Sequence, residues 1–568
     1  MTEKRAAVWL LGIAGKYKWN IVLLVLLQAI ANGGAVCYAL VMKQMVDAAV
    51  GKEEESFFAC LITFGLLMLF LMLFRMVLRQ LEEATKSGME NRLKESLLNQ
   101  LLRKDYGQVN SVHSEEWMNR MTSDTAVCAG GMTDILPGFM GMLVRMSGAL
   151  VLMFVLQPRL AYILIPGGVF FLLITLILKK YLKGYHKKVQ EKDGAVRVYL
   201  QERISSMLIL RTFGAEKHAI NGANQKFSEH KEARMRKALI SNFANTGFSF
   251  AINGMYLIGI GYCGYGILHG VVSYGTLTAM MQLIGQLQAP LAGISGFVPK
   301  FYAMIASAER LMEAEDYKEA NTDVIESREE AQEFYDNAIE EIICNKVSFD
   351  YKKENDSCPV LQEVSMSVKK GDFVAMTGTS GCGKSTLLKL LMGVYEPKDG
   401  SIDIVTKDRE KQPVGMYRRL FSYVPQGNFL MSGTIREVIT FDKEDDRGSS
   451  VAMEEAIRLA CGEFVFELPE GPETMLGEKG AGLSEGQMQR IAIARALYAD
   501  TPILILDEAT SALDSETESR LLNHLKQLTD KTVLIVTHRT EAMKLCNRRF
   551  HFETEGILTE HREVAEIE

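Results

Sequence analysis

Residues 378–386 read Gly378-Thr379-Ser380-Gly381-Cys382-Gly383-Lys384-Ser385-Thr386, which satisfies the pattern GxxxxGK[ST]. An apolar run, Phe373–Thr377, precedes this stretch, and a helical run, Leu387–Met392, follows it. In that context the glycines let backbone N–H groups surround phosphate oxygens at a helix N-terminus. The motif alone also occurs in unrelated loops, but the strand–loop–helix order favours a nucleotide site. We expect the binding residues to be Gly378, Ser380, Gly381, Cys382, Gly383, Lys384, Ser385 and Thr386.

Two adjacent carboxylates end another apolar run. Ile503–Leu506 leads directly into Asp507 and Glu508. In phosphoryl-transfer sites one such acid holds Mg²⁺ and the next faces the attacking water. We therefore assign Asp507 and Ser385 to the metal and Glu508 to the general base. A purely structural role, in which both acids cap a helix that starts near Ala509, is the alternative.

The first half of the chain has a different character. The 568 residues are 48% hydrophobic, but long uncharged runs gather in the first half. A membrane core about 30 Å thick needs about 20 apolar residues of helix. Between Lys237 and Lys300 there is no Lys, Arg, Asp or Glu, which leaves room for two spans. Six spans are expected in total, the other four being Trp19–Met42, Ser56–Phe74, Leu136–Leu156 and Leu160–Leu178.

The basic residues predict how these spans are oriented. Segments 75–132 and 179–237 are rich in Lys and Arg, whereas the connection after the first span is acidic. Loops rich in Lys and Arg stay on the cytoplasmic side of a membrane. We therefore expect both long loops and both termini in the cytoplasm. An all-helical soluble domain inserted at two places is the alternative.

The composition changes again after the last expected span. Residues 313–337 are polar and acidic without apolar periodicity, which is typical of a linker. Beyond them short apolar runs alternate with helical stretches, and Ile503–Asp507 and Thr532–Thr537 are expected as buried parallel strands. The expected domains are therefore an α-helical transmembrane domain at 1–312 and an α/β P-loop domain at 338–568.

Charge and cysteine content exclude other classes of protein. The formal charge of −7 gives no reason to expect nucleic-acid binding, which needs a basic face. The nine cysteines are scattered singly, without a CxxC or Cys/His cluster. Neither a zinc site nor a disulfide framework is therefore expected.

Leu483-Ser484-Glu485-Gly486-Gln487, about twenty residues before the two acids, looks like the signature of the ABC ATPases. Other motifs of that family stand in the same order along the chain: Tyr351, Gln426 in Tyr423-Val-Pro-Gln426, Gly477-Glu478, Ser511–Asp514 and His538. The chain resembles an ABC transporter of the exporter type. Its resemblance implies a six-span helical transmembrane domain fused to a RecA-like ABC ATPase domain with a helical subdomain.

The resemblance also implies roles for single residues. Tyr351 would stack on adenine, Gln426 would sense Mg²⁺ and the attacking water, and His538 would contact the γ-phosphate. The implied cofactors are ATP and Mg²⁺. The catalytic set is Glu508, His538 and Gln426, and the metal set is Ser385, Gln426 and Asp507.

The signature implies a second subunit. In the family, Ser484, Gly486 and Gln487 would approach ATP held by the opposite half, so this chain supplies one half of a transporter. One chain leaves homodimer and heterodimer open. Glu485 stands where the family usually has Gly, and a carboxylate near a polyphosphate favours a heterodimer with a non-identical half.

The implied function is ATP hydrolysis coupled to export across a bacterial plasma membrane by alternating access. Short coupling helices, expected at Gly107–Ser114 and Tyr199–Met207, would pass closure of the ATPase domains to the cargo cavity. Import by the same fold is one alternative. A non-transporting membrane regulator that uses ATP as a switch is another.

The sequence leaves the cargo unidentified. Methionines recur along the spans, where they either belong to the core or face lipid, or line an adaptable cavity. The cavity alternative points to an amphipathic or hydrophobic small molecule, lipid or peptide as cargo. Arg145 is the only charge inside an expected span, and it lies either in the cargo path or near the cytosolic face. Several polar residues either line a cavity or join helices: Gln28, Asn32, Asn242, Asn245, Asn253, Gln282, Gln286 and Gln288.

Overall fold

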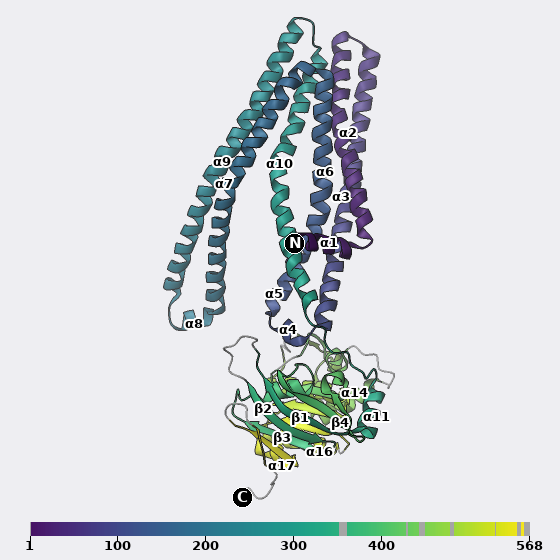
Figure 1. Cartoon of the computed structure of the whole chain (residues 1–568), viewed down its shortest axis with the longest axis vertical. Helices are drawn as coiled ribbons and strands as arrows, with labels where there is room; N and C mark the ends of the chain where they lie inside the picture. Colours follow the sequence, from purple (N-terminus) through teal and green to yellow (C-terminus); the bar gives the residue numbers. More distant parts are fainter. Residues whose placement is uncertain are drawn as a thin grey trace. The chain divides into compact units, whose positions relative to one another are not determined.

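A computed structural model describes residues 2–351, 360–427, 430–441, 449–477, 482–528, 530–553 and 558–561, although not every side chain within its helices. The chain forms two compact units (Figure 1). The helical unit comprises Met1–Gln100 and Ser114–Asp316, and the α/β unit comprises Leu101–His113 and Tyr317–Glu568. Each unit is described by itself below.

The helical unit is built from long helices joined by short connections. Its elements are α1 (Thr2–Ala14), α2 (Tyr17–Gly51), α3 (Glu54–Arg103), α5 (Ser114–Asn119), the π-helical turn η1 (Arg120–Asp124), α6 (Thr125–Leu156), α7 (Pro158–Ser205), α8 (Met207–Thr212), α9 (Glu216–Leu268), α10 (Tyr274–Met312) and the 3₁₀ turn η2 (Glu313–Asp316).

Helices α2, α6 and α10 pack together around a buried core that also includes part of α9. Small residues let the backbones approach closely. An added Cβ at Gly275, near the start of α10, would lie 2.1 Å from the carbonyl oxygen of Lys43 in α2. Asp47 caps the same end of α10, since its carboxylate accepts from Ser273 Oγ at 3.0 Å and from the Gly275 N–H at 2.8 Å.

Helices α7 and α9 run side by side, with α8 at their common tip (Figure 1). Tyr199 of α7 donates its hydroxyl to the carbonyl of Ala219 in α9 at 3.0 Å. An exposed ion pair of Lys192 and Glu229, 2.7 Å apart, joins the same two helices. The short helix at this tip begins at Met207, where the expected coupling helix ended, because Tyr199–Ser205 still belongs to the last turns of α7.

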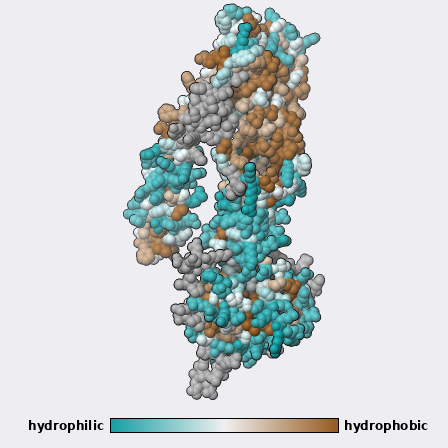
Figure 2. Space-filling view, in the orientation of Figure 1, coloured by the Kyte–Doolittle hydropathy of each residue, from teal (hydrophilic) through white to brown (hydrophobic). Residues whose placement is uncertain are grey.

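Six long helices stand where six spans were expected, namely α2, α3, α6, α7, α9 and α10. Among the described residues, four helical stretches are long and apolar enough to cross a membrane: Tyr17–Gly51, Glu54–Arg103, Ser114–Leu156 and Glu216–Leu268. Figure 2 shows apolar residues gathered along one part of the helical unit and hydrophilic ones covering most of the visible face of the α/β unit. Apolar side chains are exposed along α3. Only 6% of the apolar stretch of this helix is buried, as expected for a surface in contact with lipid.

The α/β unit contains a six-stranded sheet in the order β12-β11-β3-β10-β9-β6 and a four-stranded antiparallel sheet in the order β2-β1-β4-β5. A third pair, β7-β8, is short. The strands are β1 (Ile339–Phe349), β2 (Leu361–Lys369), β3 (Phe373–Gly378), β4 (Asp399–Thr406), β5 (Lys411–Pro413), β6 (Phe421–Val424), β7 (Gly433–Thr434), β8 (Met475–Leu476), β9 (Ile503–Asp507), β10 (Thr532–Val536), β11 (Arg548–Phe552) and β12 (Leu558–His561). The helices are α4 (Tyr106–Asn110), α11 (Arg328–Asn337), α12 (Lys384–Leu391), α13 (Ile435–Thr440), α14 (Ser449–Leu459), α15 (Glu485–Ala499), α16 (Ser515–Lys526) and α17 (Thr540–Leu545).

The parallel strands place the predicted motifs at one edge of the large sheet. Strand β10 pairs in parallel with β3 on one side and with β9 on the other. Because the carboxyl ends of parallel strands meet at the same edge, the loops after β3, β9 and β10 are neighbours. Helices α13, α14 and α15 pack into a common core that forms the helical subdomain. The expected α/β P-loop fold is therefore confirmed.

Residues 317–337, expected as a linker, belong to the α/β unit. Helix α11 buries Ala331 and Tyr335 in that unit's core, and the Tyr335 hydroxyl lies 2.7 Å from Thr532 Oγ1. Ser327 caps the helix by accepting from the Glu330 N–H at 3.1 Å. Because the segment is so rich in acidic residues, its sequence was typical of a linker and did not indicate this short amphipathic helix.

Candidate functional site: a nucleotide-phosphate site

Strand β3 ends in the P-loop, whose conformation depends on glycine. Gly378, Gly381 and Gly383 have φ values of +141°, +83° and +102°. Residues that carry a Cβ rarely adopt such backbone angles. An added Cβ at Gly378 would also lie 2.7 Å from the carbonyl oxygen of Phe552 in β11. The loop can therefore turn sharply and present its N–H groups at the start of α12.

Lys384 is the first residue of α12 and is only 5% exposed. Its ammonium donates to the carbonyl of Gly378 at 2.7 Å and to that of Thr379 at 2.8 Å. Cys382 is buried beside it, with its Sγ 3.8 Å from the Lys384 ammonium. The loop thus holds one positive charge at its centre, while Ser380 is exposed on its outer side.

Asp507 is 1% exposed at the end of β9. Burial raises the pKa of its carboxyl above the ordinary value, and hydrogen bonds with Ser385 and Tyr423 oppose that rise. The Tyr423 hydroxyl donates to Asp507 Oδ2 at 3.2 Å. The other oxygen, Oδ1, is buried without a hydrogen bond.

These oxygens fit a divalent cation of the Mg²⁺ type. A buried carboxylate oxygen without a donor is unfavourable unless a cation faces it, and Mg²⁺ prefers oxygen ligands from one or two side chains plus phosphates and water. Asp507 Oδ1 and the Ser385 hydroxyl are such oxygens. In the described part of the chain no three His, Cys, Asp or Glu side chains converge.

Glu508 lies beside two other predicted residues, Gln426 and His538. The Gln426 side-chain amide donates to Glu508 Oε2 at 2.7 Å, and His538 Nε2 lies 4.0 Å from Glu508 Oε1. Glu508 has a φ of +52°, which is unusual for a residue with a side chain. Its N–H donates to the carbonyl of Val536 at 3.1 Å, so strand β10 holds this backbone in place. Gln426 and His538, which are far apart in sequence, thus meet around the Glu508 carboxylate.

Tyr351 lies next to the P-loop helix, and the residue is 52% exposed. Its hydroxyl is 2.8 Å from Thr386 Oγ1. The ring packs edge to face with Phe349 and Tyr395, with centroid distances of 5.1 and 5.6 Å. A partly exposed aromatic face held beside a phosphate loop is suited to stacking on a base.

The signature residues form the start of α15. Ser484 accepts from the Gln487 N–H at 3.3 Å, and the Ser484 N–H donates to Gln487 Oε1 at 2.9 Å, which is a capping box. An added Cβ at Gly486 would lie 2.8 Å from the carbonyl oxygen of Ala512. Glu485 is exposed in the first helical turn, where a negative charge is favourable for the helix dipole. Ser484 and Glu485 therefore face solvent, while Gly486 packs against the loop after β9. Glu478, just before the signature, lies outside the described residues.

Helix α4, within the expected first coupling region, packs on the α/β unit. Tyr106 contacts Tyr395 edge to face, with ring centroids 5.6 Å apart. Asn110 donates to the Tyr395 hydroxyl at 3.2 Å, and the Lys318 N–H donates to Gln108 Oε1 at 2.7 Å. Helix α4 therefore packs within the α/β unit, and its coupling role stays a prediction.

The helical unit contains a pocket of about 270 Å³. Gln28, Glu82, Asp134, Phe297 and Lys300 contribute to its wall, so it is lined by charged, polar and aromatic groups. The Lys300 ammonium is 3.1 Å from Asp134 Oδ2. Its mixed lining is suited to an amphipathic molecule.

Two polar residues of the expected spans, Gln286 and Asn32, donate hydrogen bonds to backbone carbonyls of the helices, whereas Arg145 Nε has none. Gln286 is 6% exposed and donates to the carbonyl of Ala35 at 2.9 Å, which joins α10 to α2. Asn32 donates to the carbonyl of Gln28 on its own helix at 2.8 Å. Arg145 is half-buried, and its Nε is buried without a hydrogen bond. Gln286 thus acts as a link between helices.

Several residues next to the site were not expected from the sequence. Tyr423 donates to Asp507, and Arg539, which directly follows His538, is hydrogen-bonded to the loop after Glu508. Their positions beside Gln426 and His538 in the sequence were a possible signal. Nothing in the local pattern indicated their partners, because these contacts cross from one strand end to another.

Comparison with known proteins places both units in one family. The family model described as "ABC transporter transmembrane region" matches residues 21–291, and the model described as "ABC transporter" matches residues 361–511. A probable multidrug resistance ABC transporter ATP-binding/permease protein of Bacillus subtilis is 31% identical over 390 residues, which cover 67% of this chain and 64% of that protein. The match thus spans slightly less than two thirds of that relative.

Two further comparisons cover more of both chains. An ATP-dependent lipid A-core flippase of Syntrophus aciditrophicus is 31% identical over 441 residues, which cover 76% of this chain and 70% of the flippase. The structure of a bacterial Atm1-family ABC exporter with ATP bound superposes with a TM-score of 0.76 at 21% identity, covering 96% of this chain and 94% of that one. The last comparison confirms the fold, and the sequence matches identify the chain as a member of the ABC transporter family.

Proposed function

We propose that this chain is one half of an ATP-driven exporter. The observation that carries the proposal is the convergence of Lys384, Asp507 and Glu508 at one sheet edge, in a chain whose other unit carries apolar helices of membrane-spanning length. A site of this kind binds and hydrolyses a nucleoside triphosphate. Fusion to spanning helices couples that reaction to movement across a bilayer.

The side chains divide the chemistry among themselves. Glu508 takes the proton of the attacking water, and Gln426, which donates to Glu508 at 2.7 Å, orients the same water. His538 lies on the other side of Glu508 and contacts the γ-phosphate. Lys384 and the P-loop N–H groups neutralise the phosphate charge.

Ser385 and Asp507 would hold Mg²⁺, with Gln426 close by. The ion would supply positive charge that offsets the charge of the phosphate oxygens. Asp507 Oδ1, which is buried without a hydrogen bond, would be the carboxylate ligand of the ion. Tyr423 keeps the carboxylate in place by donating to Oδ2.

The partner is a second half-transporter. Ser484 and Gly486 belong to a helix start whose outer face is free to meet a nucleotide held by another subunit. An additional acid at Glu485 favours a non-identical partner that supplies an unmodified signature, although the exposed position fits a homodimer as well. The mass of the purified assembly distinguishes the two.

We place the protein in the plasma membrane of a bacterium, with the ATPase domain and both termini in the cytoplasm. Cargo would be an amphipathic or hydrophobic molecule. Two relatives are named for multidrug resistance and for lipid A-core flipping, which concern molecules of this kind. The mixed lining of the pocket around Glu82 and Phe297 supports the same class.

Transport assays in inside-out membrane vesicles test the function. With an amphipathic dye such as Hoechst 33342 and a fluorescent phospholipid as probes, ATP should drive accumulation of at least one of them in the lumen. Loss of preloaded probe would indicate import, and ATP hydrolysis without flux in either direction would indicate a regulator. Vesicles that carry Glu508→Gln are the control, because they should bind ATP without transporting.

Tyr351→Ala should weaken ATP binding about tenfold, because stacking on a base contributes about 1–3 kcal/mol. Tyr351→Phe keeps the ring and loses only the hydroxyl contact with Thr386, so its affinity should stay within about threefold of wild type. Binding of inorganic triphosphate should be the same in all three proteins. Equal losses for ATP and triphosphate would contradict the stacking role. Isothermal titration measures both affinities.

A further inference from the structure

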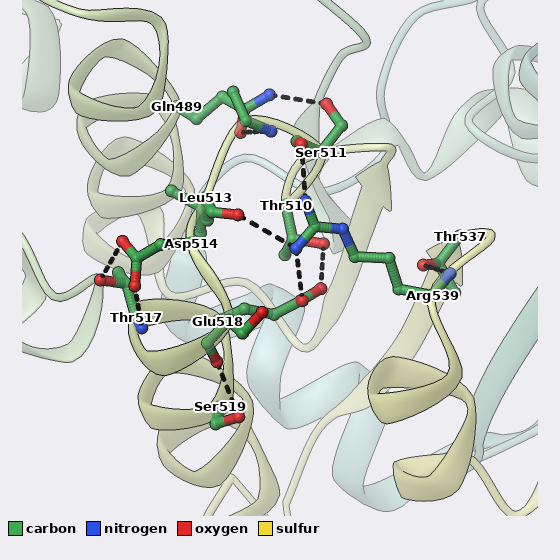
Figure 3. A network of polar contacts seen from close by, with 12 residues as sticks. Gln489, Thr510, Ser511, Leu513, Asp514, Thr517, Glu518, Ser519, Thr537 and Arg539 are labelled. Carbon is green, nitrogen blue, oxygen red and sulfur yellow. Dashed lines mark hydrogen bonds and ion pairs between the residues drawn. The ribbon is translucent and has the colours of Figure 1, made fainter.

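A short loop follows the two catalytic acids and runs from Ser511 to Asp514, and we name it the Ser511–Asp514 turn. Two side chains from separate elements hold this turn (Figure 3). Arg539 follows His538 at the end of β10, and Gln489 lies on α15, the helix that begins with the signature. The turn therefore connects the signature helix to the residues around the γ-phosphate.

Arg539 makes three charge-assisted hydrogen bonds here, two to the turn and one to Glu518 on α16. Its guanidinium donates to the carbonyls of Ser511 at 2.8 Å and Leu513 at 3.0 Å, and to Glu518 Oε2 at 2.6 Å. The Glu518 side chain is 4% exposed, and its other oxygen accepts from Thr510 Oγ1 at 2.8 Å. A planar guanidinium can satisfy these acceptors together, whereas the single ammonium of lysine cannot reproduce the geometry.

Gln489 holds the same turn from the opposite side. Its side-chain amide donates to Ser511 Oγ at 3.0 Å, and its Oε1 accepts from the Ala512 N–H at 3.0 Å. Gln489 is 6% exposed. One turn earlier on α15, Gly486 lies so close to the Ala512 carbonyl that a Cβ there would be 2.8 Å from it. Helix α15 and the turn are thus locked by packing as well as by hydrogen bonds.

These contacts leave little freedom for α15 to move alone. Glu518 lies on α16 (Ser515–Lys526), which directly follows the turn, so drawing this segment away from Arg539 would leave the buried Glu518 carboxylate without its cation, which is strongly unfavourable. A displacement of α15 therefore carries the turn with it, and Arg539 passes the displacement to the adjacent backbone of His538. Glu508 lies three residues before the turn and is moved by the same segment.

We propose that Gln489 and Arg539 form a relay through the Ser511–Asp514 turn, by which nucleotide held against the signature of this chain sets the position of His538 in this chain's own site. The relay rests on the proposed two-site dimer. Ser484 and Gly486 contact the nucleotide of one site, whereas His538 and Glu508 serve the other. Arg539 and Gln489 are positioning residues, because they act on the reaction through His538 and the turn.

The test uses the full-length transporter in lipid and measures ATPase rate against ATP concentration. Wild type should respond cooperatively, with a Hill coefficient above 1 and at most 2 for two sites. Arg539→Ala should lower kcat about tenfold and bring the Hill coefficient to 1, while ATP affinity by direct titration stays unchanged. Arg539→Lys should fall between the two. Lys544→Ala is the matched control, because its exposed pair with Glu541 on α17 touches neither turn nor nucleotide.

A double-mutant cycle separates a relay from two independent structural roles. Gln489→Ala should lower kcat and the Hill coefficient as Arg539→Ala does, and the double variant should be no worse than the more affected single variant. Multiplicative losses in the double variant would overturn the relay. A wild-type Hill coefficient of 1, an unchanged coefficient in both variants, or a parallel loss of ATP affinity and melting temperature would overturn it too. An inactive wild-type assembly that contains both halves would instead contradict the proposed function itself.

Discussion

Glu508→Gln should lower the ATPase rate at least about a hundredfold and leave ATP binding intact. General-base catalysis contributes about 10²–10⁴ to a rate, and the amide of glutamine cannot accept the proton of water. Glutamine has nearly the shape of glutamate, and its oxygen can still accept from Gln426, which donates to Glu508 at 2.7 Å. The P-loop contacts of Lys384 do not involve Glu508. The expected result is therefore a lower ATPase rate with an unchanged affinity for ATP.

Phosphate release and ATP titration on the same preparation measure both quantities. Glu541→Gln is a matched control, because Glu541 is exposed and only pairs with Lys544 at 2.8 Å, and it should hydrolyse ATP as wild type does. Turnover retained in Glu508→Gln would remove Glu508 from the role of base. Gln426 or His538 would then be the group to examine, because both lie beside the same carboxylate.

Local sequence was sufficient for the nucleotide fold. Strand β9 has the bounds expected for it, Ile503–Asp507. A short apolar run that lies between a helix and two acids rarely forms anything other than a buried strand. The P-loop likewise combines a strand, three glycines with positive φ and a helix start within a few residues. Both features depend on contacts between near neighbours, which a sequence pattern records directly.

Features that depend on distant contacts were harder to predict. Helix α11 is acidic, and only the burial of Ala331 and Tyr335 against strands that come much later explains why it is ordered. The second loop helix, α8, begins only at Met207, since α7 continues as far as Ser205. Nothing in the chain around His538 indicates that Arg539 would pair with Glu518. Such contacts are determined by how whole helices and strands pack against one another.

Lys384→Ala should reduce ATP affinity about a hundredfold and abolish measurable ATPase activity. Hydrogen bonds to a charged group contribute about 1.5–3 kcal/mol, and Lys384 supplies the buried ammonium of the P-loop. Its removal leaves phosphate oxygens facing the carbonyls of Gly378 and Thr379 without a neutralising charge. Lys526→Ala, at the exposed end of α16, is the control and should bind ATP normally.

Thermal unfolding with and without ATP measures this loss independently of turnover. Ligand binding stabilises the folded state by RT ln(1 + [ATP]/Kd), which is about 2.7 kcal/mol when ATP is at a hundred times Kd. A hundredfold weaker Kd at the same ATP concentration leaves only about 0.4 kcal/mol, so the ATP-dependent rise in melting temperature should nearly vanish. The melting temperature without nucleotide separates this effect from damage to the fold. If Lys384→Ala kept the full ATP-dependent rise, the phosphate charge would have to be neutralised by the loop N–H groups alone, and the buried ammonium would serve only to hold the carbonyls of Gly378 and Thr379 together.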